Sequence, residues 1–419
     1  MKQETLEKFA GETGNNFKQT EIGLIPEDWE VVRLGEVAKV VRGVSWKKTE
    51  ANKEGKGIPV LTIPNVEKGK INFEFNYFLT KSVSRQKLLN LKDIIFVASS
   101  GSIENVGRNA ILKYLPFERI AFASFLSVLR AETNKIVPEF LYFLINSRWI
   151  DFTKFVKRAA DGKYNFQLRD FERNALIPLP PLPEQRKIVR VLDKIQQAIE
   201  IQDRIIEQAK RLKKSLMQKL FTEGLYGEEQ KETEIGLIPK SWEVVKFEDS
   251  ILKRRIEIGK IKQQEYKAFG KYPVIDQSQN YIAGFCDDDE KVYRGDLPVI
   301  IFGDHTRVFK FVNFPFVVGA DGVKVLIPNK EIYDPKFLFY TMLTLNIPSR
   351  GYNRHYKLLR EKKLPLPPLE EQKQIVHILS TVDKKIEVEQ KRKQVLKALF
   401  ETMLHKLMSG EIRLKEVEI

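Results

Sequence analysis

The sequence predicts an α+β protein in which one architecture is built twice. We expect two mixed α/β domains separated by an antiparallel two-helix coiled coil, with an internal pseudo-two-fold repeat. Two short boxes each occur twice, in the same order, and a long stretch with helical apolar spacing follows each second box. Between the boxes lie short segments rich in Ile, Val and Phe, broken by Gly, Asn, Asp and Ser, a pattern typical of short strands and turns.

The first box opens each half of the chain. Residues 20–34 read TEIGLIPEDWEVVRL and residues 233–247 read TEIGLIPKSWEVVKF, so that eleven of fifteen aligned positions are identical. A match of this length indicates an internal duplication. Two related halves in one chain imitate a homodimer, which is the basis for expecting pseudo-two-fold symmetry.

The second box is rich in proline and closes each half. Residues 178–189 read PLPPLPEQRKIV and residues 365–376 read PLPPLEEQKQIV. Pro183 fits the first turn of a helix, where its missing N–H is not needed, and Glu184 suits the positive end of the helix dipole. Glu370 replaces this proline in the second copy. We expect a helix of about 40 residues, or about 60 Å, to follow each box.

Apolar residues in both predicted helices follow alternating steps of four and three, as in the seam of a coiled coil. The first stripe continues through Leu212 and Leu216 after a slip in register. Gln202 and Glu389 take corresponding polar positions near mid-helix, where polar residues commonly fix register. The alternative is that each helix packs alone on its own globular domain. The predicted interface residues are Ile188, Leu192, Ile195, Ile199, Ile206, Leu212, Leu216, Ile375, Leu379, Val382, Ile386, Leu396, Leu399 and Met403.

Short strands and two short helices are expected in the regions between the boxes. The spacing predicts helices at 138–146 and 335–344. The predicted strands are 92–98, 107–112, 121–130, 272–275, 297–302, 308–312 and 322–327.

Composition limits the class of protein. The formal net charge of +15, from 71 Lys and Arg against 56 Asp and Glu, suits a polyanionic partner such as nucleic acid. The alternative is that the basic charge only keeps the protein soluble. The single cysteine, Cys286, excludes an intrachain disulfide and a thiolate zinc cluster. The polar N-terminus and the short apolar runs predict a cytoplasmic protein with no signal peptide and no membrane partner.

Signatures of catalysis are absent from the sequence. It lacks a G-x-x-x-x-G-K-[ST] phosphate loop, a G-x-G-x-x-G turn and the [DN]-P-P-[YF] tetrapeptide of amino-methyltransferases. The four histidines, His305, His355, His377 and His405, show no metal-binding spacing. Duplicating an active site would preserve its residues in both halves, and no catalytic set is preserved. We therefore expect a binding protein without enzymatic activity, cofactor or metal.

Polar and basic loops in each half carry side chains of the types that contact nucleic acid. Arg and Lys pair with guanine, Asn and Gln with adenine, and Ser and Thr with either. The expected DNA-binding residues of the first half are Arg42, Ser45, Lys47, Lys48, Ser100, Ser102, Asn105, Arg108, Lys163, Tyr164, Asn165 and Arg169. Those of the second half are Lys253, Arg254, Arg255, Gln277, Gln279, Asn280, His305, Thr306, Arg307, Arg350, Asn353, Arg354, His355 and Lys357.

Simpler structural roles compete with some of these assignments. The Tyr164–Asn165 and Tyr352–Asn353 pairs precede the proline boxes at comparable distances and also fit a connector. Residues 277–280 also fit a turn. Trp29 and Trp242 are expected in the core, because a base-reading residue should differ between halves that read different sequences. The opening boxes, proline boxes and long helical stretches repeat, while the regions between them differ. This pattern is expected of one shared framework that carries two different DNA-recognition regions.

The boxes give the whole chain, from about residue 20 to residue 414, a resemblance to a known family. The G-L-I-P-x-x-W box, the L-P-P-L-x-E-Q boxes and the LMSGEIRL ending resemble the specificity subunit of type I restriction-modification systems. The resemblance implies that each target-recognition domain reads one half of a split DNA site and that the helices set the spacer. It also implies docking to two methyltransferase subunits, which use S-adenosylmethionine, and to restriction subunits, which use ATP and Mg²⁺ and carry out cleavage.

The resemblance and the repeat together divide the chain into five parts. The expected parts are a polar N-terminal tail (1–19), target-recognition domain 1 (20–178), conserved long helix 1 (179–226), target-recognition domain 2 (227–364), and conserved long helix 2 with the C-terminal tail (365–419). Two other functions are kept open: a nuclease or DNA methyltransferase with its own recognition domains, and a coiled-coil adaptor without a DNA role.

Overall fold

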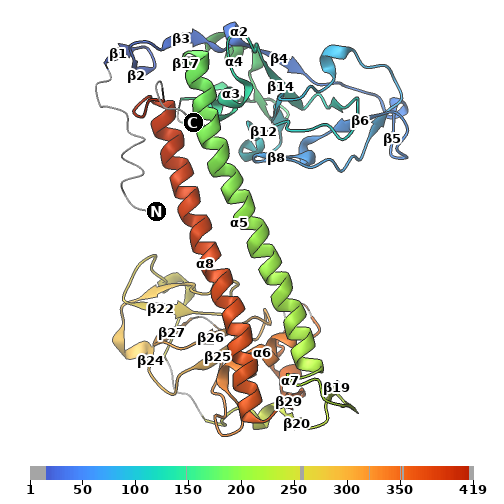
Figure 1. Cartoon of the computed structure of the whole chain (residues 1–419), viewed down its shortest axis with the longest axis vertical. Coiled ribbons are helices and arrows are strands. Elements are labelled where there is room, and N and C mark those ends of the chain that lie inside the picture. Colours follow the sequence, from blue (N-terminus) through green and yellow to red (C-terminus); the bar gives the residue numbers. More distant parts are fainter. Residues whose placement is uncertain are drawn as a thin grey trace. The chain divides into compact units, whose positions relative to one another are not determined.

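The computed structural model describes residues 16–147, 149–254, 259–319, 321–349, 351 and 353–414. The chain divides into two compact units (Figure 1), unit 1 from Met1–Ile201 and Lys393–Ile419, and unit 2 from Gln202–Arg392. The two long helices, α5 (Leu182–Thr222) and α8 (Leu369–Met408), both cross this division. Each unit therefore contains one α/β globule and one part of each helix. The predicted five-part division, which assigns whole helices to separate segments, stays a prediction.

Unit 1 is centred on an antiparallel sheet in the order β12-β10-β14-β4. Its middle strand β10 is fully buried, as its run of Ile, Phe and Val predicts. The bounds in this sheet are β12 Asn109–Ile111, β10 Ile94–Val97, β14 Leu126–Ala131 and β4 Ala38–Arg42. A second sheet has the order β13-β6-β9-β5, with bounds Ala121–Phe122, Ile58–Leu61, Phe78–Leu79 and Ala51–Asn52.

Smaller elements complete unit 1. The opening box forms the hairpin of β1 and β2 and then β3, which pairs with β17 of the proline box. The remaining strands form one three-stranded sheet, β11-β16-β15, and one hairpin, β7-β8. The bounds are β1 Phe17–Thr20, β2 Gly23–Pro26, β3 Glu30–Arg33, β7 Val66–Glu67, β8 Lys70–Ile71, β11 Ser99–Ser100, β15 Val156–Arg158, β16 Tyr164–Phe166, β17 Leu176–Leu179, α2 Leu34–Val37, α3 Pro138–Ile145 and α4 Leu168–Asn174.

Unit 2 repeats this plan with different sheets. Its opening box forms the β18-β19 hairpin and β20, which pairs with β29 of the second proline box. One sheet has the order β26-β25-β28, and a second has the order β21-β27-β22-β23, with β24 also paired to β27. The bounds are β18 Gln230–Thr233, β19 Gly236–Pro239, β20 Glu243–Lys246, β21 Lys260–Ile261, β22 Tyr272–Ile275, β23 Gly284–Cys286, β24 Val292–Tyr293, β25 Val299–Gly303, β26 Phe309–Val312, β27 Phe316–Gly319, β28 Val323–Leu326, β29 Lys363–Leu366, α6 Pro335–Thr344 and α7 Tyr356–Arg360.

The predicted strands and short helices are observed, with one correction. Residues 121–130, predicted as one strand, form two strands in different sheets: β13 pairs in parallel with β6, and β14 pairs with β10 and β4. A turn separates them, closed by a hydrogen bond from the Leu126 N–H to the Ala123 carbonyl at 2.8 Å. The apolar run continues through this turn because both strands are buried.

The two long helices pack together within each unit. In unit 1, Ile188 and Leu192 of α5 share a core with Leu404 and Leu407 of α8. Unit 2 joins the opposite ends, since Leu220 of α5 lies in a core with the first turns of α8. The start of each helix thus packs with the end of the other, so α5 and α8 run antiparallel within each unit (Figure 1).

The seam positions differ in burial. Ile188, Leu192, Ile375 and Leu379 are fully buried, Ile206 is nearly so, and Glu389, predicted as a polar seam residue, is 1% exposed. Leu212 departs from the prediction with 53% exposure. The remaining predicted seam residues are half-buried: Ile195, Ile199, Leu216, Val382, Ile386, Leu396, Leu399 and Met403.

A buried carboxylate at the start of α5 fastens the opening box to the proline box in unit 1. The indole Nε1 of Trp29, which is fully buried as predicted, donates to Glu184 Oε2 at 3.1 Å. Arg413, in the segment after α8, donates to both carboxylate oxygens of Glu184 at 2.7 and 2.8 Å. The adjacent Gln185 accepts from the N–H of Val137 at 2.8 Å, just before α3. One Glu-Gln pair thus joins four segments of the chain.

Unit 2 repeats this arrangement with equivalent residues. Trp242 Nε1 donates to Glu371 Oε2 at 2.9 Å, and Gln372 accepts from the N–H of Asp334 at 2.8 Å, just before α6. The segment after α5 supplies the remaining donor, because the N–H of Leu225 bonds to Glu371 Oε1 at 2.8 Å. The tryptophan of the opening box and the Glu-Gln pair of the proline box, which are identical in both copies, therefore hold each globule on a helix start.

Replacing Arg413 with Ala should destabilise unit 1. Glu184 is 3% exposed and would lose its cation, a change that costs about 3–5 kcal/mol in a buried pair. Urea unfolding followed by tryptophan fluorescence measures this loss. The matched control is Arg360→Ala, because the ion pair of Arg360 with Glu248 is solvent-exposed and worth roughly 0–1 kcal/mol. An equal loss of stability in both variants would contradict the assignment.

Candidate nucleic-acid interface

Corresponding loops leave the same end of the central sheet in both units. In unit 1, β4 and β10 both run antiparallel to β14, so their C-terminal ends lie at one edge. Residues 43–48 and 98–108 follow these ends. In unit 2, β25 runs antiparallel to β28. Ile251 forms an antiparallel bridge with Pro328, which follows β28, so the segment at Ile251 also runs antiparallel to β28. Residues 252–254 and 304–307 therefore occupy the corresponding positions.

The segment before α4 joins the loops of unit 1. β11 pairs with β16, so that Ser99 lies opposite Asn165 and the Ser99 hydroxyl donates to Asn165 Oδ1 at 2.6 Å. The predicted Tyr-Asn pair is thus strand β16 and contacts the loop after β10. The segment can serve both as a connector and as a binding loop. Its strand pairing uses the backbone of Tyr164, and the side chains of Tyr164 and Asn165 remain half-buried.

A hollow of about 650 Å³ lies where these three segments meet. Four of the predicted residues line it: Arg42, Ser45, Asn165 and Arg169. The side chains of both arginines are exposed, so their guanidinium groups are available to a ligand in the hollow. Sequence reasoning missed Lys87, Ser124 and Gln167, which line the same hollow. Lys87 and Ser124 lie outside the basic loops, and only the folded sheet brings them there, whereas Gln167 lies between the predicted residues Asn165 and Arg169.

Other predicted residues of unit 1 bond to one another. Ser100 is nearly buried and its hydroxyl accepts from Asn105 Nδ2 at 3.4 Å, while Arg108 donates to Asn105 Oδ1 at 3.1 Å and to the Ile63 carbonyl at 3.1 Å. These three side chains therefore shape the loop. Lys163 pairs with Asp161 at 3.0 Å in solvent. Lys47, Lys48 and Ser102 are exposed.

Three loops of unit 2 converge through Gln277 and Thr306. The Gln277 side chain accepts from the N–H of His305 at 3.1 Å and donates to the Asp321 carbonyl at 3.0 Å. The Thr306 hydroxyl donates to the Gln277 carbonyl at 2.6 Å. The predicted turn at residues 277–280 is therefore fixed against the loop after β25, and its next polar residues, Gln279 and Asn280, remain exposed.

Asp304 joins the segment before α7 to this group. Its carboxylate, 2% exposed, accepts from the N–H groups of His355 at 2.8 Å and Tyr356 at 2.7 Å. The His355 ring lies 2.9 Å from the Asp304 carbonyl oxygen and is fully buried. This corrects the expected role of His355, because a side chain held in this way shapes the loop and is not presented at the surface. The contacts of Asp304 join the loop after β25 to the segment before α7. In unit 1 the Ser99–Asn165 contact joins the corresponding segments, after β10 and before α4.

The remaining predicted residues of unit 2 lie around these loops. Arg354, Asn353 and Lys357 are exposed beside Asp304. Arg307 adopts a left-handed backbone conformation and donates to the Ile347 carbonyl at 2.9 Å. Arg254 pairs with Asp296 at 2.8 Å, and Lys253 lies 4.0 Å from Glu248. Arg255 and Arg350, with the neighbouring Tyr352, lie outside the described residues.

Lys310 was also missed by sequence reasoning. It is 4% exposed, and its ammonium group contacts the Asn280 carbonyl at 2.5 Å and lies 3.6 Å from Asp276. Burial lowers the pKa of Lys310, while Asp276 opposes that shift. Lys310 therefore holds the turn at residues 277–280 through the Asn280 carbonyl. Its position in β26, a strand of alternating burial, did not indicate that role in the sequence.

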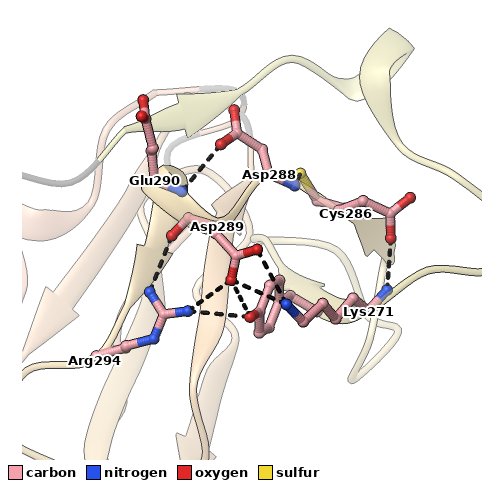
Figure 2. Close-up of polar contacts among 8 residues, drawn as sticks. Lys271, Cys286, Asp288, Asp289, Glu290 and Arg294 are labelled. Carbon is pink, nitrogen blue, oxygen red and sulfur yellow. Dashed lines mark hydrogen bonds and ion pairs between the residues drawn. The ribbon is translucent and has the colours of Figure 1, made fainter.

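Local partners neutralise an acidic run on the other sheet of unit 2. Figure 2 shows Asp289 between Lys271 and Arg294, with contacts of 3.0 and 3.1 Å. The Tyr272 hydroxyl and Lys271 hold the pKa of Asp289 below its usual range. Among the described residues, no group of three or more His, Cys, Asp or Glu side chains is placed to hold a metal ion. No helix in the described part of the chain is long and apolar enough to cross a membrane.

Comparison with known proteins gives one consistent family. The model of the type I restriction modification DNA specificity domain matches residues 26–211 and 239–398. The putative type I restriction enzyme MjaX specificity subunit of Methanocaldococcus jannaschii is 30% identical, covering 96% of this chain and 97% of the relative. The MjaVIII specificity subunit of the same organism is 27% identical, with the same coverage.

Solved structures share the fold at low sequence identity. The S subunit of a type I restriction-modification system from M. genitalium superposes with a TM-score of 0.59 at 16% identity, covering 95% of this chain and 98% of that one. A chain from a study of the assembly of the type I R-M system gives a TM-score of 0.52 at 19% identity, covering 92% of this chain and 99% of that one.

Replacing Asp304 with Ala should loosen the loop before α7. The N–H of Tyr356 would lose its acceptor, which costs about 1–3 kcal/mol for an unsatisfied group, while the N–H of His355 would keep the Asp304 backbone carbonyl at 2.8 Å. Hydrogen exchange should accelerate most at the amide of Tyr356 and less at that of His355. Asp296→Ala serves as the control, since the Asp296 carboxylate is half exposed. Unchanged exchange at both amides would show that Asp304 does not hold this loop.

Proposed function

The chain belongs to the type I restriction-modification DNA specificity family, and from this premise we propose that each of its two units reads one half of a split double-stranded DNA site. The observation that carries the proposal is the repeated loop arrangement. In both units, loops from the same edge of the central sheet meet the segment before a short helix. The opening and proline boxes that frame these loops are nearly identical in the two units, and the loops carry different residues.

The hollow of unit 1 suits the edge of a DNA base pair or a phosphate. Arg42 and Arg169 offer donors in a planar fork, which matches guanine O6/N7 or phosphate oxygens, and Asn165 can pair with adenine. In unit 2, the exposed Gln279, Asn280, Asn353, Arg354 and Lys357 play this part. Residues 40–177 then determine one half-site and residues 248–363 the other, within the domain bounds expected from the sequence.

The long helices act as a ruler in this proposal. We infer that α5 and α8 form one antiparallel two-helix coiled coil along their whole length, which sets the spacer between the half-sites. The contacts between them at both helix starts support this arrangement. Because protein dimers and pseudo-dimers read sites about one DNA turn apart, the half-site centres should lie about 10 base pairs apart.

Catalysis belongs to partner subunits in this proposal. Two methyltransferase subunits dock on the chain and methylate the site, and restriction subunits join them to cleave DNA. The chain itself supplies sequence recognition without enzymatic activity. The family match and the relatives named as specificity subunits support this division of labour.

A chimaera tests the proposal. Residues 248–363 are replaced by the corresponding segment of a family member with a different target, and methylated sites are mapped by sequencing after assembly with the methyltransferase subunits. We expect one altered half-site and one unchanged half-site, because each unit carries its own loops. Exchanging residues 40–177 is the matched control and should alter the other half-site. A change in both half-sites from one exchange would overturn the proposal.

A further inference from the structure

The turn between β13 and β14 presents a phenylalanine at the loop edge of unit 1. β14 begins at Leu126, opposite Val97, the last residue of β10, so this turn lies at the edge from which the polar loops leave. Phe125 is 46% exposed, whereas Ala123 and Leu126 are buried. An isolated exposed apolar side chain is ordinary on a protein surface. The significance of Phe125 therefore depends on how it is held and on what lies beside it.

Backbone hydrogen bonds hold Phe125 between two of the loops. Its carbonyl accepts from the N–H groups of Ala98 at 2.8 Å and Ser99 at 3.1 Å, both in the loop after β10. The preceding residue, Ser124, donates its N–H to the Val44 carbonyl at 2.9 Å, in the loop after β4. The backbone that carries the Phe125 ring is therefore fixed to both loops, so binding a ligand there orders little further chain.

Phe125 lies at the margin of the hollow in unit 1. The residue before it, and the two residues that bond to its carbonyl, all line this hollow. Arg42 and Arg169 line the same hollow, and their exposed guanidinium groups suit phosphate or guanine. DNA bound by these arginines would place the edges of neighbouring base pairs at Phe125.

The chemistry of base edges indicates what the ring contacts. In the major groove, the edges of adenine, guanine and cytosine present hydrogen-bonding groups, whereas thymine also presents an apolar C5-methyl group. A phenylalanine ring offers neither a conventional donor nor an acceptor, so it does not satisfy polar base edges or phosphates. Apolar contact with the thymine methyl group, by contrast, removes both partners from water and distinguishes thymine from the other bases.

Unit 2 has a glycine at the corresponding position. The N–H of Asp304, the first residue after β25, donates to the Gly322 carbonyl at 2.7 Å. In unit 1 the equivalent bond runs from Ala98, the first residue after β10, to the Phe125 carbonyl. Gly322 has a φ of 82°, and a Cβ there would lie 2.7 Å from Cδ2 of His305. The turn of unit 2 therefore leaves no room for a side chain, and the two units differ in apolar character at this point.

We propose that Phe125 contacts the C5-methyl group of a thymine in the half-site that unit 1 reads, which makes it a specificity-determining residue. This inference rests on the proposed function, which supplies the DNA. It assigns one base of that half-site to an apolar side chain, whereas the residues expected from the sequence were chosen for their polarity or charge. Unit 2 cannot make the corresponding contact, because Gly322 has no side chain.

Removing single methyl groups from the DNA tests the contact. The full chain is assembled with its methyltransferase subunits, and the half-site of unit 1 is identified by mapping methylated sites. Each thymine of this half-site, in either strand, is then replaced by deoxyuridine, which pairs in the same way but lacks the methyl group. For the unaltered chain, one replacement should weaken binding about fourfold, the equivalent of about 0.8 kcal/mol for one buried methyl group. In Phe125→Ala, the same replacement should have no effect.

Phe125→Leu and Phe117→Ala are the matched variants. Leucine keeps an apolar surface, so Phe125→Leu should retain most of the dependence on the methyl group. Phe117 is 48% exposed but follows β12, which ends at the opposite edge of the sheet, because its last residue Ile111 pairs with the first residue of β10. Phe117→Ala should bind both duplexes as the unaltered chain does. Thermal unfolding of the variants should remain that of the unaltered chain, since both positions are exposed.

The inference would be overturned if the half-site of unit 1 contained no thymine, if no single replacement weakened binding by the unaltered chain, or if the methyl dependence persisted in Phe125→Ala. Equal weakening of all duplexes by Phe125→Ala would also overturn it, because a ring inserted between base pairs would act without reading a methyl group. Failure of the proposed function is a distinct result, since exchanging residues 40–177 would then leave both half-sites unchanged.

Discussion

The buried hydrogen bond between a tryptophan and a glutamate at the start of each long helix is the contact on which the rest of the structure depends. Glu184 and Glu371 are both 3% exposed, and a buried carboxylate is tolerated only when its oxygens are satisfied. Trp29 and Trp242 supply one donor each, and the segment after the opposite helix supplies the others. Opening box, helix start and helix end are thus fixed by one side chain in each half.

The glycines after the helices follow from the same constraint. Gly224 and Gly410 have positive φ angles of 67° and 74°. A Cβ atom there would lie 2.8 Å from Pro239 Cγ in one half and 2.3 Å from Pro26 Cγ in the other. Each helix therefore ends with its backbone against the proline of an opening box, and this close approach requires glycine. The framework tolerates little change, whereas the loops at the sheet edge are free to differ.

The parts of the fold predicted from sequence are those set by local pattern. Helix α6 begins and ends at the predicted residues, because Pro335 starts it and a continuous apolar pattern defines its length. The two tryptophans are buried as expected, since both stand at an identical position of the repeated opening box. Leu212 was misplaced because a slip in register leaves the helical face ambiguous over one turn. Residues 121–130 were misjudged because apolar residues stand on both sides of the turn and Phe125 within it is also apolar, although it is 46% exposed.

The candidate interface was only partly predictable, because long-range contacts determine it. The residue types of Arg42, Asn165 and Arg169 suggested DNA, but nothing local indicated that they share one hollow. His355 looked equally suitable, and only its contact with Asp304, 51 residues away, shows that it is buried. The tie between Trp29 and Glu184 spans 155 residues and has no sequence periodicity to reveal it.

The central claim is that two independent readers are held at a distance set by the paired helices, and a lengthened ruler tests it most directly. Four residues are inserted after Gln202 and four after Glu389, so that both helices lengthen by about 6 Å. Circular dichroism first establishes that the variant folds, and methylated sites are then mapped. Because a base-pair step is about 3.4 Å, the account predicts unchanged half-sites with a spacer one to two base pairs longer. An unchanged spacer, or altered half-sites, in a folded variant would contradict it.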